Sequence, residues 1–520
     1  MRTYSQNNLP VEAGKNIAVV QTEYGAVRGY IHDGIFTFKG IPYGKAERFM
    51  APQNPEKWSG IRSCMSYGAV CPSSSSPIFS DEFAFAFQRD LGISNENCLN
   101  LNIWTQSINC DKKKPVMVYI HGGGFSSGSS HEFPCLDGGN LSKKGDVVFV
   151  SFNHRLNVLG FLDLSAYGDK YKQSANAGAI DMLLALTWVK ENISSFGGDL
   201  SNVTIFGQSG GGTKVMCLMN APSAKGLFNK AIVQSGSSLT HIIEDSIAKR
   251  VSAELLKQLN LRSDQVDSLR NMPYELLDAA GKKALMQVEK SVKSEDMSVF
   301  GLEWEPVHDG DFLPYQPTEQ AAIELSKDIP LLVGSCKNEF MPFITGTANI
   351  SMDEVKSKIE KKYPGKTPIY LAAVKKAYPT TFIPIDYINI DFLFRPLAIK
   401  QADEKATTGT APVYQYIFTW QSPVLDGQFR ALHCMDLPFV FNNIQRSEEM
   451  TGGGKEAYLL ADKMSEAWIN FAKTGNPNYK GLPEWPAYNP KKGAVMVFDK
   501  KCIVKYHYDK ELLKIGAAKN

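Results

Sequence analysis

The sequence predicts an α/β fold with a large, mostly parallel central sheet flanked by helices. Short apolar runs, typical of buried strands, alternate along the chain with stretches whose apolar residues recur at helical spacing. At residues 201–221 a β-branched run, a glycine-rich turn and a helical pattern follow one another directly. No linker, low-complexity segment or internal repeat divides the chain, so we expect residues 1–520 to form a single domain.

The predicted elements begin with a β-hairpin at residues 17–31 and a short strand at residues 35–39. Buried strands are then predicted at residues 116–120, 147–153, 203–206, 231–234, 329–334 and 413–418. Helices with a core-facing apolar pattern are predicted at residues 180–193 and 455–473. The charged helical segment 244–299 is expected to lie over the sheet as an insertion, and the basic helical segment 350–378 to present a solvated face.

The composition is that of an ordinary globular protein and excludes several classes of function. The 56 basic and 54 acidic residues are spread along the chain, and no basic block indicates binding to nucleic acid or to an anionic membrane. No apolar run approaches ~18 residues, so we expect no membrane-spanning helix. The nine cysteines are scattered without metal-ligand spacing, so we expect no metal or organic cofactor.

Ser209 is the candidate nucleophile of the chain. It lies in the turn Gly207-Gln208-Ser209-Gly210-Gly211, with a strand pattern before it and a helix pattern after it. Strand, tight turn and helix around G-x-S-x-G is the arrangement of a nucleophile elbow. A second match at residues 124–128 does not directly follow a strand and precedes no helix pattern, so the sequence favours Ser209.

A serine hydroxyl is a weak nucleophile and needs a base, usually a histidine oriented by a carboxylate. After an elbow serine the acid and then the base follow along the chain, each behind a strand. His433 follows the predicted strand 413–418 and is the best base candidate. Three other histidines follow the serine but fit this order less well: His241, His308 and His507. Glu339 follows the strand 329–334 and is the acid candidate, although a lone loop glutamate is ordinarily a solvated surface residue.

Two further features leave alternatives open. Three consecutive glycines, Gly122 to Gly124, directly follow the strand 116–120 and present backbone N–H groups without side-chain obstruction, as an oxyanion site requires. Taken alone, they would also suit a flexible turn. Cys71 and Cys98 bound a loop rich in serine and phenylalanine, and their spacing is compatible with a disulfide or with two unpaired thiols.

Motifs along nearly the whole chain resemble the type-B carboxylesterases and cholinesterases of the α/β-hydrolase superfamily. They are similar above all to bacterial members of the para-nitrobenzyl esterase type. The motifs that carry the resemblance are residues 38–43, 96–102, 121–125, 153–155, 192–211, 309–314 and 433–441. Together they are far more specific than G-x-S-x-G alone.

The resemblance implies a serine hydrolase that cleaves small-molecule carboxylic esters through an acyl-enzyme, with no cofactor. It implies a catalytic triad of Ser209, Glu339 and His433, and an oxyanion hole made by the backbone N–H groups of Gly123, Gly124 and Gly210. Amide hydrolysis at the same site is an alternative. A non-catalytic binding protein is a second alternative, but relatives of that kind have lost triad residues.

The resemblance also implies a disulfide between Cys71 and Cys98, and therefore an oxidising compartment. The first residues lack the apolar core of a signal peptide, so either the protein stays inside the cell or a leader was removed before residue 1. With the disulfide, a periplasmic or extracellular location is favoured over a cytoplasmic one.

The sequence departs from many relatives on both sides of the nucleophile, with Gln208 in place of glutamate and Gly210 in place of alanine. A neutral Gln208 removes a negative charge near His433, which predicts weaker attraction for cationic substrates. The substrate pocket is expected to be lined partly by four phenylalanines of the loop between the two cysteines: Phe79, Phe83, Phe85 and Phe87.

Overall fold

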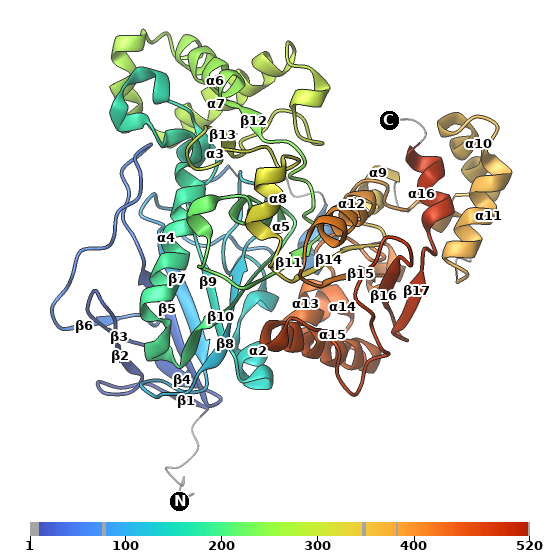
Figure 1. Ribbon diagram of the computed structural model, residues 1–520, viewed down its shortest axis with the longest axis horizontal. Helices are drawn as coiled ribbons and strands as arrows, with labels where there is room; N and C mark the ends of the chain where they lie inside the picture. Colours follow the sequence, from blue (N-terminus) through green and yellow to red (C-terminus); the bar gives the residue numbers. More distant parts are fainter. Residues whose placement is uncertain (1–9, 75–79, 346–349, 381–382, 518–520) are drawn as a thin grey trace, which may run out of the picture.

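The computed structural model describes residues 10–74, 80–345, 350–380 and 383–517. Within these ranges the fold is built on a twelve-stranded sheet (Figure 1). In spatial order its strands are β1 (Val11–Glu12), β4 (Tyr30–His32), β5 (Ile35–Pro42), β7 (Asn100–Thr105), β9 (Val148–Phe152), β8 (Lys114–Ile120), β10 (Gly198–Gln208), β11 (Lys230–Gln234), β14 (Leu331–Cys336), β15 (Val413–Phe418), β16 (Ala494–Phe498) and β17 (Ile503–Tyr506). The large central sheet predicted from the sequence is therefore confirmed.

The seven central strands, from β9 to β16, run parallel, and antiparallel strands extend the sheet at both edges. Strands β9, β11, β14, β15 and β16 are buried along their whole length, as parallel strands covered on both faces must be. Parallel strands end at one edge of the sheet, so the loops that follow β8, β10, β14 and β15 meet there.

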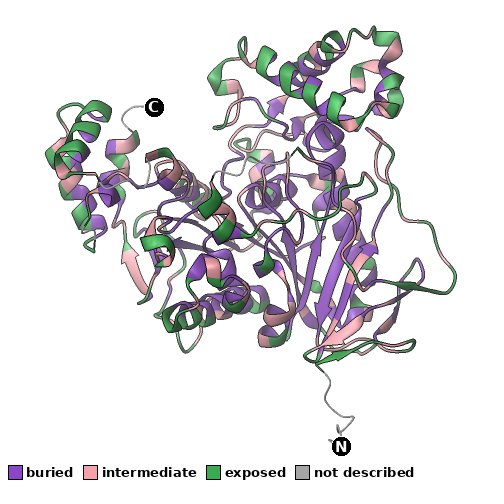
Figure 2. Ribbon diagram, turned by 180° about the vertical axis from the view of Figure 1, so that it is seen from behind, coloured by how far each residue is buried: buried purple, intermediate pink, exposed green. Residues whose placement is uncertain are grey.

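Alternate residues of the central strands pack into two separate hydrophobic cores, one on each face of the sheet. On β8, for example, Val116, Val118 and Ile120 belong to one core, and Met117 and Tyr119 to the other. The first core includes helices α4 (Ala177–Asn192), α5 (Gly210–Met219) and α12 (Phe394–Thr408). The second includes α2 (Gly139–Gly145), α13 (Leu437–Val440) and α15 (Lys455–Thr474). The sheet and its two helical layers account for the purple interior of Figure 2.

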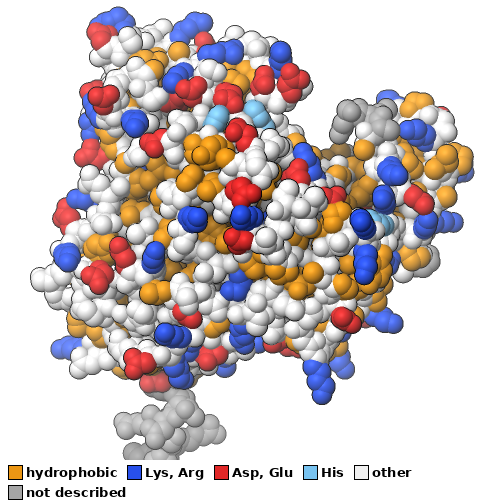
Figure 3. Space-filling view, in the orientation of Figure 1, with side chains coloured by type: hydrophobic (Ala, Val, Ile, Leu, Met, Phe, Trp, Pro, Cys, Tyr) orange, Lys and Arg blue, Asp and Glu red, His pale blue; other side chains and the backbone are white. Residues whose placement is uncertain are grey.

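Two helical lobes extend beyond these layers (Figure 1). Helices α6 (Asp245–Gln258) and α7 (Tyr274–Glu289) form one, within the segment predicted to be an insertion. Helices α10 (Met352–Lys362) and α11 (Thr367–Ala377) pack with the C-terminal α16 (Lys510–Ala517) around a hydrophobic cluster of their own. Figure 3 shows hydrophobic side chains gathered between the lobes and charges of both signs scattered over the rest of this face.

The remaining α-helices and strands are short. They are α1 (Asp81–Phe87), α3 (Asn157–Phe161), α8 (Gln320–Ser326), α9 (Met341–Thr345), α14 (Glu448–Thr451), and the strands β2 (Val19–Gln21), β3 (Ala26–Arg28), β6 (Ile61–Ser63), β12 (Ile243–Glu244) and β13 (Val307–His308). Strands β2 and β3 form the predicted hairpin, outside the main sheet. In the described part of the chain, no helix has the length and apolarity needed to cross a membrane.

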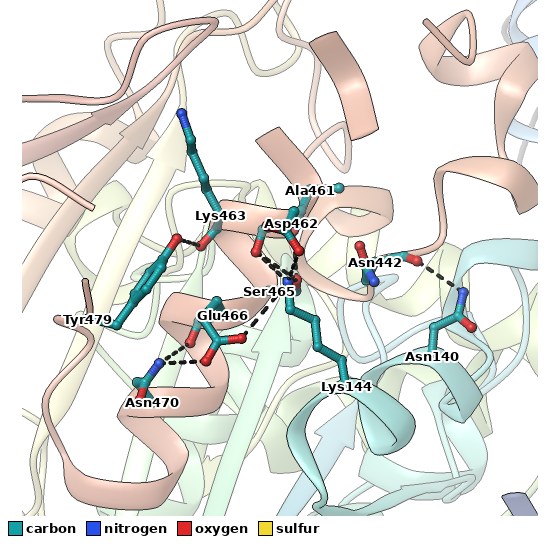
Figure 4. A network of polar contacts seen from close by, with 10 residues as sticks. All are labelled: Asn140, Lys144, Asn442, Ala461, Asp462, Lys463, Ser465, Glu466, Asn470 and Tyr479. Atoms are coloured by element: carbon teal, nitrogen blue, oxygen red, sulfur yellow. Dashed lines mark hydrogen bonds and ion pairs between the residues drawn. The ribbon is translucent and has the colours of Figure 1, made fainter. Parts of the chain in front are cut away.

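A polar network fastens the second helical layer together (Figure 4). Lys144 of α2 donates hydrogen bonds from Nζ to the backbone and side-chain oxygens of Asp462 on α15, both at 2.5 Å, and to Ser465 Oγ at 3.0 Å. Asn140, one turn earlier on α2, donates to the Asn442 carbonyl at 3.0 Å. The Lys144 contacts join α2 to α15, and the Asn140 contact joins α2 to the residues that follow α13.

A buried ion pair fixes α4 to the segment after β9. Arg155 donates from Nε to Asp181 Oδ2 at 2.8 Å and from Nη2 to Oδ1 at 2.7 Å. Its Nη1 also donates to the carbonyls of Glu47 and Met50. Both partners are buried, so each charge depends on the other for compensation.

We therefore predict that Asp181→Ala lowers the free energy of unfolding by about 3–5 kcal/mol, because it leaves the Arg155 guanidinium buried and unpaired. Urea denaturation measures this loss. The double variant Arg155→Met with Asp181→Leu should recover most of it. Asp353→Ala, which breaks the exposed pair with Lys356 on α10, is the control and should change stability little. A loss as small as that of the control would contradict the prediction.

Candidate active site

Ser209 stands between the last residue of β10 and the first residue of α5, in a conformation with φ 59° and ψ −132°. Such a backbone conformation is strained for a residue with a side chain, and neighbouring contacts must hold it. The Ser209 N–H donates to the Gln234 carbonyl at 2.8 Å. A Cβ on Gly211 would collide with the Ile120 carbonyl, and one on Gly207 with the backbone of Gly211. The glycines thus let β10 turn sharply into α5, as the sequence predicted.

Glu339 and His433 meet behind this elbow. Glu339 lies three residues past β14 and accepts a hydrogen bond from the Cys336 N–H at 2.7 Å through Oε1. Its Oε2 accepts from Nδ1 of His433, and the His433 N–H donates to the Glu339 carbonyl at 3.2 Å. The two residues are 1% and 5% exposed. The structure therefore brings the predicted acid and base into direct contact.

Gln208 contacts the other side of the histidine ring. Its Nε2 lies 3.3 Å from His433 Nε2, and its Oε1 accepts a hydrogen bond from the Cys434 thiol at 3.1 Å. Since Nδ1 donates to Glu339, Nε2 is the acceptor and the Gln208 amide is the donor. In the sequence, Gln208 was notable because it is neutral where many relatives carry a negatively charged glutamate. Its role as a hydrogen-bond partner of His433 became visible only in the structure.

The predicted oxyanion-hole residues come from two adjoining segments. Gly123 and Gly124 lie in the loop after β8 with φ of 82° and 60°, and Gly210 begins α5. A Cβ on Gly210 would collide with the backbone of Gly124, which explains why alanine is absent here. In the described part of the chain, the N–H groups of Gly123 and Gly124 donate to no carbonyl or side chain.

Ser209 and the three glycines line one cavity of about 360 Å³, within the range of small-molecule sites. Five of its other lining residues are aromatic: Phe125, Phe300, Trp304, Phe340 and Phe394. Glu303 and Glu305 also line it, and burial raises the pKa of Glu305 well above its usual value. The cavity therefore presents an apolar wall and two carboxyl groups.

The prediction that phenylalanines of the 71–98 loop line the pocket is wrong for those that the structure describes. Phe83 and Phe87 stack at 4.4 Å and pack edge-on against Phe429, and Phe85 is exposed. Phe79 lies outside the described residues. The pocket aromatics come instead from the loops before β13 and after β8 and β14, and from α12.

The predicted Cys71–Cys98 disulfide is also wrong, because both cysteines are free thiols. Cys71 Sγ accepts a hydrogen bond from the Leu156 N–H at 3.2 Å. A thiol hydrogen bond with Cys71, together with burial, raises the pKa of Cys98. That shift disfavours the thiolate through which disulfides form. The two cysteines therefore give no support to an oxidising compartment.

The model of the carboxylesterase family matches residues 16–515 of the chain. The chain belongs to the carboxylesterase family. Among curated relatives, the para-nitrobenzyl esterase of Bacillus subtilis (strain 168) is 36% identical over 94% of this chain and 96% of its own length. The phenmedipham hydrolase of Pseudarthrobacter oxydans is 31% identical over 92% of this chain and 94% of its own.

Solved structures agree with this assignment. An esterase from Clostridium hathewayi that can hydrolyse aliphatic aromatic polyesters superposes with a TM-score of 0.86 at 37% identity, covering 96% of this chain and 98% of that one. A carboxylesterase from Geobacillus stearothermophilus superposes with a TM-score of 0.74 at 33% identity, covering 96% of this chain and 99% of its own. This carboxylesterase family member thus has the α/β-hydrolase fold and is a carboxylic-ester hydrolase.

We predict that Gln208→Glu moves the acid limb of ester hydrolysis to higher pH by about one unit. A carboxylate beside Nε2 favours the protonated imidazole, which accepts no further proton, so activity is lost at a higher pH as the solution is acidified. The pH dependence of kcat/KM for a neutral para-nitrophenyl ester measures the shift. Gln208→Ala removes only the hydrogen bond that the neutral imidazole accepts, so it should move the limb in the same direction but by less than Gln208→Glu. Coincident limbs in the wild type and Gln208→Glu would refute the prediction.

Proposed function

We propose that this enzyme hydrolyses small carboxylic esters through an acyl-enzyme on Ser209, with His433 as general base and Glu339 as its orienting carboxylate. The observation that carries the proposal is the buried contact between His433 Nδ1 and Glu339, next to an elbow that exposes Ser209 to the cavity. The three residues follow strands β10, β14 and β15 at the same edge of the sheet.

In the first half-reaction Ser209 Oγ attacks the ester carbonyl carbon as its proton passes to His433 Nε2. The Gln208 amide that contacts Nε2 in the free enzyme must give way to this proton. Glu339 stabilises the resulting imidazolium through Nδ1. The tetrahedral intermediate then collapses, the C–O bond to the alcohol breaks, and His433 returns the proton to the leaving oxygen.

In the second half-reaction water repeats these steps on the acyl-enzyme. His433 takes a proton from water, the hydroxide attacks the acyl carbon, and the proton returns to Ser209 as the acid leaves. In both halves the negative oxygen would be held by the N–H groups of Gly123, Gly124 and Gly210. Loss of one such donor typically lowers the rate by ~10²–10³-fold. The N-terminus of α5 adds a favourable dipole at the same place.

The cavity favours small esters with an apolar or aromatic part, given its five aromatic rings and its size. The named activities of relatives, on para-nitrobenzyl esters and on aliphatic aromatic polyesters, also concern esters with an aromatic part. Amide hydrolysis would use the same groups, but no contact in the cavity favours it. Retention of all three triad side chains favours an enzyme over a binding protein.

The test compares Ser209→Ala with Ser126→Ala, the serine of the second G-x-S-x-G match, which lines the same cavity. Ser209→Ala should lose fluorophosphonate labelling and lower kcat for para-nitrophenyl butyrate by at least ~10⁴-fold, whereas Ser126→Ala should keep both. Butyranilide, the matching amide, should be hydrolysed far more slowly than the ester by the wild type. Labelling or hydrolysis retained by Ser209→Ala would overturn the proposal.

A further inference from the structure

Lys214 is a fully buried lysine on the second turn of α5, five residues after Ser209. In the described ranges no carboxylate lies within ion-pair distance of it. An unpaired ammonium in the interior is costly, and an apolar side chain at this position would avoid that cost. The presence of a lysine therefore calls for a function beyond packing.

The ammonium of Lys214 contacts the backbone of the loop that carries Gly123. Its Nζ donates to the His121 carbonyl at 3.0 Å and to the Gly122 carbonyl at 3.4 Å. The carbonyl of Gly122 and the N–H of Gly123 belong to one planar peptide group. Lys214 thus contacts the opposite end of the amide whose N–H belongs to Gly123, and Gly123 lines the cavity with Ser209. The same Gly122 carbonyl also accepts a hydrogen bond from Nδ1 of the neutral His121 ring at 3.0 Å, so Lys214 adds charge to an amide that is already hydrogen-bonded.

The other charged and titratable groups near Lys214 do not neutralise it. Glu132 is already paired with Arg89 at 2.6 Å. The rings of His121 and His154 stack at 5.0 Å, and burial holds the pKa of both well below the usual value, so both are neutral. The Phe125 ring lies 5.8 Å from Nζ. Burial lowers the pKa of Lys214 itself to about 7, so its charge changes in the range where a serine esterase works.

We propose that Lys214 is a positioning residue of the oxyanion hole, whose ammonium orients and polarises the Gly122–Gly123 peptide toward the negative oxygen of the intermediate. The proposal rests on the proposed function, because it needs Ser209 as nucleophile and Gly123 as oxyanion donor. A hydrogen bond to a carbonyl strengthens the N–H of the same amide as a donor, and hydrogen-bond chains polarise one another. The positive charge also acts through a dry interior, where electrostatic interactions are stronger than in water.

The effect belongs to the transition state, because the negative oxygen exists only there. Lys214 should therefore raise kcat while leaving KM nearly unchanged. The value of kcat should also depend on whether the ε-amino group of Lys214 is protonated. As pH rises through about 7 the ammonium loses its charge, so kcat should pass a maximum and fall toward a lower plateau.

The experiment measures kcat and KM against pH for para-nitrophenyl butyrate in the wild type, Lys214→Met, Lys214→Gln and Lys230→Met. Lys230 is the matched control, since it is also buried with a pKa lowered to about 8, but it lies at the amino end of β11, opposite the site. Lys214→Met should lower kcat by about 10- to 100-fold below pH 7, keep KM within about twofold, and abolish the alkaline decline. Lys214→Gln keeps a hydrogen-bond donor without the charge. Below pH 7 its kcat should lie between those of the wild type and Lys214→Met, and its kcat should show no decline at alkaline pH.

Lys230→Met should match the wild type both in kcat below pH 7 and in the decline of kcat at alkaline pH. The proposal is overturned if Lys214→Met keeps the wild-type kcat, or if its kcat falls by the same factor at every pH, as a merely structural role would give. Should Lys214→Met fail to fold, Lys214→Gln decides, because a Lys214→Gln variant that keeps the wild-type kcat below pH 7 contradicts the proposal. Failure of the proposed function is separate, since the wild type would then not be labelled by a fluorophosphonate at Ser209.

Discussion

The close backbone contact at the end of β10 is the constraint on which the site depends. Ser209 keeps its positive φ because Gly207 and Gly211 let α5 lie against the end of β8, where a Cβ on either glycine would collide with the backbone. The parallel register of β8, β10, β11, β14 and β15 then carries the following loops to the same edge. Hydrophobic packing on both faces of the sheet therefore holds the strained turn in place, with Ser209 lining a cavity.

Burial controls the polar groups around this serine. Glu339 and His433 are shielded from water, so their contact is directional and strong, and the rings of Phe340 and Phe394 lie against the imidazole at 4.3 and 5.2 Å. The Gln208 amide contacts Nε2 of His433, and the Cys434 thiol donates a hydrogen bond to Gln208 Oε1. Lys214 contacts the carbonyl of His121 in the loop after β8, on the other side of the glycines. In the proposed mechanism the reacting atoms would lie between the Glu339 carboxylate behind the histidine and the Lys214 ammonium behind the glycines.

The strand pattern sufficed to predict the parallel sheet and the elbow, because the periodicity of apolar residues is a local property of the sequence. The charged helical pattern at 244–299 predicted an insertion over the sheet, and α6 and α7 within it form a lobe beyond the layers. The strand pattern also placed Glu339 and His433 at strand ends, where parallel topology brings them together. The Cys71–Cys98 disulfide was predicted from the resemblance alone. The two thiols do lie together, but both are free, because proximity alone does not oxidise a cysteine pair. The contact of Gln208 with His433 joins residues 225 positions apart, and the aromatic wall comes from four separate segments, so neither leaves a local signal.

In the proposed mechanism Ser209 carries the acyl group during turnover. Mass spectrometry of the intact protein can detect this covalent state after reaction with a para-nitrophenyl carbamate, whose carbamoyl-enzyme is hydrolysed slowly. We expect a mass increase of one carbamoyl group per chain, which peptide mapping assigns to Ser209, together with release of one equivalent of para-nitrophenol. A carbamoyl group on another residue, or turnover of activated esters with no covalent adduct at any time, would contradict the proposed mechanism.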